Sequence, residues 1–131
     1  MPFIQIAVSG EPEPGLAHGI ARAVTECTTR ILGTLKERIA LELRFVPKDR
    51  WFVGGESLEE LGLSSYWLEI RVTEGRHSTQ QRADYLAEIH ALMHELLGEL
   101  HPVSYAHVHA AVGDAWGFGG VSQAERAHPV A

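Results

Sequence analysis

The sequence predicts an α/β protein in which two tandem strand–helix–strand units form one four-stranded sheet with two helices on one face. Segments with period-two alternation and segments with helical spacing follow one another along the 131 residues. This order occurs twice, at an offset of about 64 residues. Because a half of about 60 residues buries too little surface alone, we expect a single compact domain: a unit at 1–55, a linker at 56–65 and a unit at 66–131.

The first unit begins with a strand. Residues 2–8 read Pro2-Phe-Ile-Gln-Ile-Ala-Val8, which alternates as a half-buried strand does. A helix follows, because Pro14 stands where a first turn tolerates proline. A second strand is expected over Ala40–Val46, parallel to the first with a right-handed crossover. The apolar residues of the helix step by three or four: Leu16, Ile20, Val24, Cys27, Ile31 and Leu35.

The second unit repeats this order. Tyr66–Val72 alternates like the first strand, and Ser78 is a suitable N-cap for the helix that follows. Tyr105–Val112 alternates again and predicts the last strand of the sheet. The apolar positions that predict the second helix are Leu86, Ile89, Met93 and Leu96.

Each unit ends with a tryptophan and a glycine pair. The two segments are Trp51-Phe-Val-Gly-Gly55 and Trp116-Gly-Phe-Gly-Gly120. Their tryptophans lie one position further apart than the first strands of the two units do, so a single residue was gained or lost between them. Both segments predict hairpins. Residues 56–65 contain three Glu and a Gly, and we interpret them as the linker.

Composition excludes several classes of protein. Apolar residues make up 45% and charged residues 21%, as in a globular protein with a packed core. Eleven Lys and Arg against 17 Asp and Glu give a net charge of −6, which argues against a nucleic-acid partner. Cys27 is the one cysteine, which favours the cytoplasm. No apolar segment is long enough for a membrane span, and no signal peptide precedes Pro2, so Met1-Pro2 is expected to begin the functional protein.

Several features in order resemble one family. The second half has a Glu74-Gly75-Arg76 turn after its first strand and an aromatic-Gly-x-Gly-Gly hairpin, as in the 4-oxalocrotonate tautomerase subunit, and the first half has proline directly after Met1. The tandem arrangement is similar to the fused members of the tautomerase superfamily, including cis-3-chloroacrylic acid dehalogenase. The resemblance covers about residues 2–55 and 66–120. It implies the tautomerase fold, also called MIF-like, and a homotrimer of double-length chains.

Pro2 and Arg76 are the candidate catalytic residues. If Met1 is removed, the Pro2 nitrogen is a secondary amine, and α-amino groups titrate near 8 before an apolar pocket or a cation lowers the pKa. Such an amine can be a neutral base at pH 7 and move a proton next to a carbonyl. The resemblance implies that Arg76 binds a substrate carboxylate and draws electrons toward it, which suits a planar, permanently charged guanidinium.

The two halves differ at these positions. When the repeats are aligned, Tyr66 is the counterpart of Pro2 and has no amine, while Pro12 is the counterpart of Arg76 and has no charge. We therefore expect one complete site per chain, with Pro2 from the first half and Arg76 from the second. Whether Tyr66 has a role of its own stays open.

Further substrate-binding candidates follow from the resemblance. Trp116 is expected to wall the pocket, with Trp51 as its structural twin. Thr73 stands where the dehalogenases have an arginine, and Thr28 where they have a helix histidine, so dehalogenation is not expected.

One family arginine has no equivalent. In the single-unit tautomerase it meets the substrate from a neighbouring subunit, and its place at the start of the second strand holds Ala40 and Tyr105 here. On the same strand faces, Arg44 or a histidine such as His107 is the candidate to compensate.

Neither a metal nor a cofactor is expected. The pairs His90/His94 and His107/His109 have spacings that could offer two imidazoles, but the zinc-protease glutamate is missing. The glycine pairs do not form a phosphate loop, because neither opens a helix or precedes Lys-Ser/Thr.

The expected function is cofactor-independent tautomerisation. The substrate class is a small 2-oxo or 2-hydroxy-dienoic acid that carries a carboxylate. Lyase or hydratase chemistry, covalent enamine chemistry on the same proline and a catalytically inactive trimeric homologue are the alternatives. The physiological substrate is not identified by the sequence.

Overall fold

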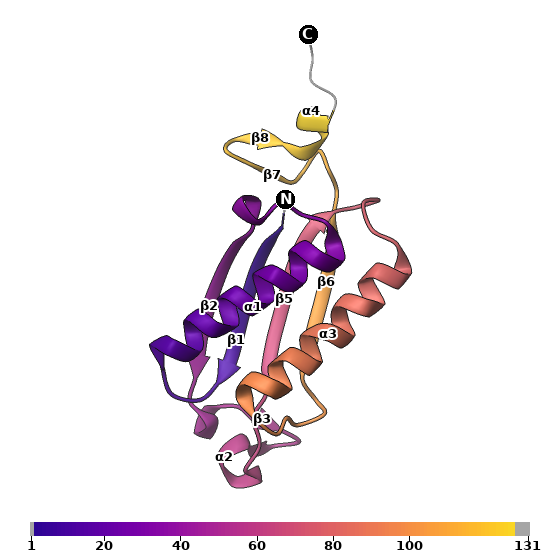
Figure 1. The fold of residues 1–131 in the computed structure, drawn as a ribbon. Coiled ribbons are helices and arrows are strands. Elements are labelled where there is room, and N and C mark those ends of the chain that lie inside the picture. The colour runs from indigo at the N-terminus through magenta and orange to yellow at the C-terminus, as the bar shows by residue number, and fades with distance from the viewer. Residues whose placement is uncertain (1, 128–131) are drawn as a thin grey trace.

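The computed structural model describes residues 2–127 and shows one four-stranded sheet with two long helices on one face (Figure 1). The strand order is β2-β1-β5-β6. This confirms the predicted fold class. The elements are β1 (Phe3–Ser9), α1 (Pro14–Leu32), β2 (Ala40–Val46), β5 (Tyr66–Thr73), α3 (Thr79–Leu97) and β6 (Tyr105–Ala111).

The register of the strands relates the two units by a pseudo-twofold axis. Strand β1 pairs in parallel with β2, and β5 with β6, while β1 and β5 are antiparallel neighbours at the centre. Gln5 pairs with Glu69, its own counterpart in the repeat, so the axis passes between them. Phe3 pairs with Arg71. The start of β1 therefore lies beside the end of β5, where the Arg76 turn begins.

Local signals fix the ends of both long helices. Pro14 occupies the first turn of α1, the Glu13 side chain accepts from the next two free backbone N–H groups, and Gly33 ends the helix at φ 71°. In α3 the Ser78 N-cap forms a capping box with Gln81. Leu35 was expected on the first helix but follows it and is 55% exposed. Among residues 2–127, no helix is both long enough and apolar enough to cross a membrane.

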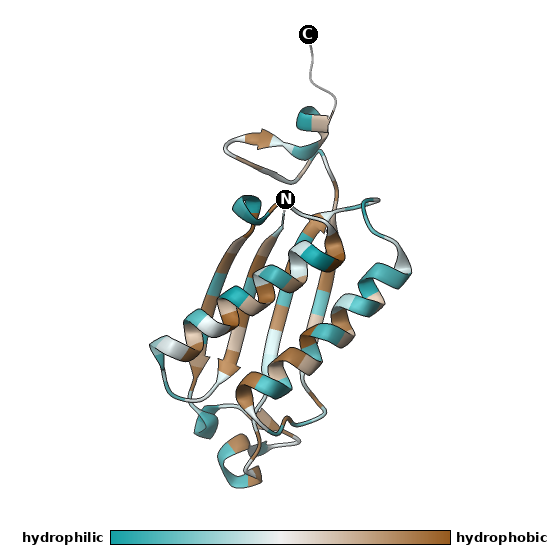
Figure 2. Cartoon of the chain, in the orientation of Figure 1, coloured by the Kyte–Doolittle hydropathy of each residue, from teal (hydrophilic) through white to brown (hydrophobic). Residues whose placement is uncertain are grey.

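The core lies between the helices and one face of the sheet. Apolar and polar residues alternate along these elements (Figure 2). Leu86 was expected to face the core but is 38% exposed, and Tyr85 is fully buried instead. The Tyr85 hydroxyl lies 2.8 Å from the Thr28 hydroxyl of α1, so its polar atom is satisfied. Besides Tyr85, large side chains of this core are Ile4, Ile6, Val8, Leu68 and Ile70 from the strands and Ile20, Val24, Ile89 and Met93 from the two long helices.

Matching hairpins follow β2 and β6. Strands β3 (Phe52–Val53) and β4 (Glu56–Ser57) pair as β7 (Gly117–Phe118) and β8 (Val121–Ser122) do. Both turns use the glycine pairs at positive φ, from 59° to 84°. The tryptophan carbonyls act alike, since Trp51 O accepts from Leu58 N and Trp116 O from Gln123 N.

The predicted linker is largely structured. Residues 56–61 form β4 and the helical turn α2 (Leu58–Leu61), whose Leu58 is fully buried. Ser57 caps this turn by accepting from Glu60 N. The three glutamates suggested a solvated connection, but the buried leucine makes this segment the end of the first unit. Its counterpart in the second unit is α4 (Gln123–Ala127).

Candidate active site

A cavity of about 480 Å³ lies where the start of β1, the ends of α1 and β5, and α4 meet. Figure 1 shows these segments together at the end of the molecule marked N. Pro2 is buried and contributes to its wall, together with Arg76 and Thr73. The structure thus brings three of the predicted site residues to one cavity. The other lining residues are Leu32, Gly33, Thr34, Leu35, Arg38, Val72, His77, Gln123, Arg126 and Ala127.

The cavity is strongly cationic. Arg76 comes from the turn after β5, Arg38 from the 3₁₀ turn η1 (Lys36–Arg38) and Arg126 from α4. Within the described chain, no Asp or Glu lines the cavity, and neither Arg38 nor Arg76 makes an ion pair. Arg126 is held in place, because it donates to Phe118 O at 2.9 Å and its guanidinium carbon lies 3.7 Å from the Phe118 ring centroid. Three guanidinium groups without a carboxylate favour an anionic ligand.

His77 contributes its imidazole to the cavity beside Arg76. Its Nε2 lies 3.0 Å from the carbonyl oxygen of Leu32, which can only accept, so Nε2 carries the proton. The other nitrogen, Nδ1, is buried and has no hydrogen-bond partner among residues 2–127. Burial lowers the pKa of His77 below its ordinary value, and the positive charge of Arg76 adds to this shift. His77 is therefore a neutral acceptor at pH 7.

Unsatisfied polar atoms gather around Pro2. In the described residues, five buried side-chain polar atoms lack a hydrogen-bond partner. Three belong to Thr73, His77 and Gln123, which line this cavity, and a fourth to Trp116 beside it. Buried polar groups are nearly always hydrogen-bonded. Their concentration here indicates a surface built to bind a polar molecule.

Trp116 lines an adjoining cavity of about 370 Å³. Pro2 and Arg38 border both cavities, so the tryptophan stands near the proline as the resemblance implied. Phe118, two residues along the same hairpin, is another wall. The structure therefore places an aromatic wall on the second side of Pro2.

Arg44 and His107 do not reach either cavity. Both lie on the face of the sheet away from the helices, where Arg44 pairs in register with Ala7 and His107 Nδ1 lies 3.5 Å from Glu69 Oε1. Ala40 does line the adjoining cavity. Arg44 shares its face but is four residues further along, about 13 Å away at the usual strand rise. Within one chain, the geometry gives no support for Arg44 or His107 in substrate binding.

The opposite end of the sheet has a different chemistry. Tyr66, the counterpart of Pro2, is 2% exposed and its hydroxyl lies 2.9 Å from His90 Nδ1. Burial raises the pKa of Tyr66 above its ordinary value. The loops at this end surround a cavity of about 370 Å³ lined by Gly10, Glu11, Lys48, Asp49 and Glu59. Three acidic residues and one lysine line this cavity, so its charge differs from that of the cavity beside Pro2.

Sequence reasoning missed four lining residues: Arg38, His77, Gln123 and Arg126. The sequence did contain a signal for His77 as a site residue, because it directly follows the predicted site residue Arg76. Arg38 had a weaker one, two residues before β2 at the end where Pro2 begins. Gln123 and Arg126 had none, since only the folded hairpin carries them to Pro2.

Comparisons with known proteins identify the fold. No family model matches the chain, and no curated protein matches it. Among solved structures, native fused 4-OT superposes with a TM-score of 0.82 at 16% identity, covering 98% of this chain and 99% of that one. The R7 fused 4-OT asymmetric trimer gives a TM-score of 0.84 at 13% identity, covering 96% and 99%.

A third likeness is a macrophage migration inhibitory factor-like protein from Entamoeba histolytica. It superposes with a TM-score of 0.76 at 15% identity and covers 92% of this chain and 97% of that one. These likenesses confirm the fold that the sequence resemblance implied. The chain has the fold of the fused 4-OT proteins of the tautomerase superfamily.

Proposed function

We propose that this protein is a cofactor-independent tautomerase that moves a proton on a small 2-oxo or 2-hydroxy-dienoic acid. One observation carries the proposal: buried Pro2 borders a cavity with three guanidinium groups and no described carboxylate. An amine base next to an anion-binding site is the arrangement that this reaction needs. The proposal requires that Met1 is removed, so that the Pro2 nitrogen is a secondary amine.

Pro2 acts as the general base. Burial disfavours the charged form of an amine, and the nearby positive charges of Arg38 and Arg76 disfavour it further. Both effects act to lower the amine pKa from the ordinary α-amino value near 8, which favours the neutral base. It removes a proton from a carbon or enol oxygen of the substrate and returns it at another position.

The remaining cavity groups bind and polarise the substrate. Arg76 pairs with the carboxylate and stabilises the negative charge that develops as the proton leaves. The unpaired Nδ1 of His77 accepts a hydrogen bond from the enol hydroxyl, and the Gln123 amide donates to a substrate oxygen. Trp116 excludes water from the side that faces the adjoining cavity.

The active form is proposed to be a homotrimer. Structures of fused 4-OT proteins include symmetric and asymmetric trimers. In this chain one sheet face is uncovered by the described helices, and it exposes Tyr105 at 62% and Trp67 at 38%. Phe52 on the first hairpin is 59% exposed. Aromatic groups gathered in this way are typical of interaction surfaces.

A matched pair of proline variants tests the proposed base. With phenylpyruvate or 2-hydroxymuconate as the substrate, Pro2→Ala should lower kcat/KM at least about a hundredfold, the lower range for general bases. Pro12→Ala is the control, because Pro12 is the exposed counterpart of Arg76 in the other half. Equal rates for Pro2→Ala and wild type, with Met1 shown to be absent by intact mass, would remove Pro2 from the mechanism.

A further inference from the structure

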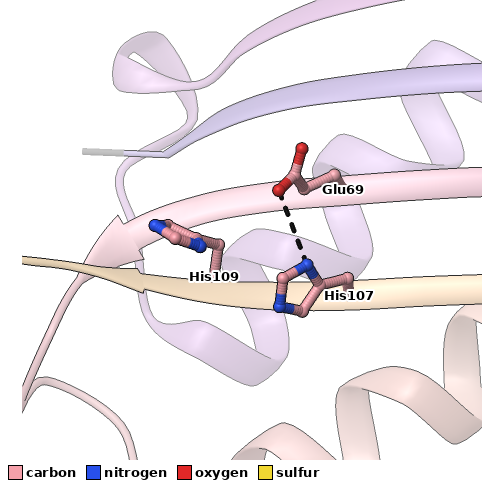
Figure 3. Close-up of side chains that lie close together, drawn as sticks. All are labelled: Glu69, His107 and His109. Atoms are coloured by element: carbon pink, nitrogen blue, oxygen red, sulfur yellow. Dashed lines mark ion pairs between the residues drawn. The ribbon is translucent and has the colours of Figure 1, made fainter.

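Glu69, His107 and His109 form a cluster on the uncovered face of the sheet (Figure 3). One donor atom from each side chain lies within 4.8 Å of the other two. None of the three residues lines the cavities beside Pro2. We propose that this cluster is a Zn²⁺ site, separate from the proposed active site.

Strand geometry brings the three residues together. His107 and His109 are two residues apart on β6, so both side chains point to the same face of the sheet. Glu69 on β5 pairs in register with His107. The imidazoles stand edge to face, with ring centroids 5.7 Å apart. The separation of the donors therefore follows from the backbone.

The donor set suits Zn²⁺ with one open coordination position. Two imidazoles and one carboxylate, with water as the fourth ligand, form a common zinc coordination sphere. Bond lengths of about 2.0–2.2 Å place tetrahedral donors about 3.3 Å apart, so the donors must approach by roughly 1.5 Å at most. In the single chain His107 and His109 are exposed, and within residues 2–127 no hydrogen bond holds their rings, so side-chain rotation can provide this movement before the proposed trimer covers this face.

Neighbouring side chains orient the carboxylate. Arg71 Nη2 lies 3.1 Å from Glu69 Oε2, which leaves Oε1 facing His107 at 3.5 Å. Arg71 Nη1 also donates to Gln5 Oε1 at 2.9 Å. The guanidinium charge opposes a bound cation, whereas its hydrogen bond fixes the Glu69 rotamer. The site is therefore expected to bind zinc more weakly than a closed structural site does.

The other half of the sheet is an internal comparison. The counterparts of Glu69, His107 and His109 across the pseudo-twofold axis are Gln5, Glu42 and Arg44. They occupy the same register positions, Gln5 paired with Glu42 and Arg44 two residues along. The same strand pairing thus forms with Gln5, Glu42 and Arg44, three side chains that together cannot bind zinc. The fold itself does not require two histidines and a glutamate at these positions.

The histidine spacing alone did not predict this site. His107 and His109 on β6 supply two donors. The third donor, Glu69, is on the neighbouring strand β5, which helix α3 separates from β6 in the sequence. The other pair, His90 and His94 on α3, is less suitable because His90 Nδ1 already bonds the Tyr66 hydroxyl. The pairing of β5 with β6 therefore supplies the missing ligand.

Zinc titration of the purified chain without a histidine tag tests the proposal. Calorimetry with ZnCl₂ at pH 7.5 should show one saturable site per chain. His109→Asn and Glu69→Gln should each weaken binding at least about tenfold. The matched controls are His18→Asn, which removes an exposed histidine on α1, and His94→Asn, which breaks the pair on α3. Both controls should bind zinc as the wild type does.

Protonation gives a second readout. Zinc and protons compete for the imidazole nitrogens, so the wild type should bind zinc more weakly as the pH is lowered from 7.5. Circular dichroism of each variant confirms that it is folded. The absence of saturable binding up to about 100 μM zinc would overturn the proposal. A Kd of that size corresponds to a binding free energy of about −5.5 kcal/mol. Binding that survives His109→Asn, or is lost in His94→Asn, would also overturn it.

Discussion

Arg76→Ala should change both catalysis and the titration of its neighbours. Arg76 lines the cavity with Pro2, and within residues 2–127 it makes no ion pair that would lessen its interaction with a substrate carboxylate. A hydrogen bond to a charged group contributes about 1.5–3 kcal/mol. Its loss corresponds to a decrease in kcat/KM of roughly ten- to 150-fold. Because Arg38 and Arg126 remain in the cavity, the lower half of this range is expected.

The same substitution should raise two pKa values. Burial is the larger cause of the lowered pKa of His77 and the Arg76 charge adds to it, so that pKa should rise in Arg76→Ala. The pKa of the Pro2 amine should rise as well, moving the base-limited part of the pH–rate profile to higher pH. Proton-detected titration of the histidines and the pH dependence of kcat/KM measure these shifts. A change of less than twofold in kcat/KM, together with an unmoved His77 pKa, would refute the placement of Arg76 in the site.

Three further outcomes are expected. Light scattering at micromolar concentration should give about three times the chain mass of 14.4 kDa, and a monomer would contradict the proposed assembly. Tyr66→Phe should change kcat/KM far less than Arg76→Ala but reduce the unfolding free energy by about 0.5–1.5 kcal/mol, through loss of the hydrogen bond to His90; a larger loss of activity would give Tyr66 a catalytic role. Because the pKa of His77 is lowered on folding, the unfolded chain binds more protons just below pH 6.5, so stability falls as the pH drops through that range. Urea unfolding of His77→Gln should show a shallower decrease, and an identical pH dependence would contradict the assigned burial.

Local patterns predicted the fold because the signals are repeated and strong. Alternation in β1 and β5, Pro14 at a helix start and Ser78 as an N-cap each depend on a few neighbouring residues. The convergence of Pro2 and Arg76 was also predictable, because pairing the two units antiparallel brings the start of β1 to the end of β5. The structure of residues 56–61, in β4 and α2, was not predictable, because the charged residues of this segment gave no sign of the single buried Leu58.

The rest of the site depends on tertiary packing. Arg126 reaches the cavity because α4 follows a hairpin that folds toward the start of β1, and no spacing in the sequence encodes that approach. Arg44 and His107 were chosen for the correct strand face, but alternation does not report how far along a strand a cavity lies. The cluster of Glu69, His107 and His109 also depends on tertiary structure, because only the pairing of β5 with β6 brings Glu69 beside His107.

Covalent labelling of the N-terminus tests the central claim most directly. A suitable reagent is 2-oxo-3-pentynoate. This compound is a 2-oxo acid with an activated alkyne, to which a neutral amine can add. Intact mass and peptide mapping should show that Met1 is absent and that each chain carries one adduct on Pro2, formed more slowly in Arg76→Ala. Retention of Met1, or an adduct on another residue at the same rate in both proteins, would contradict the account.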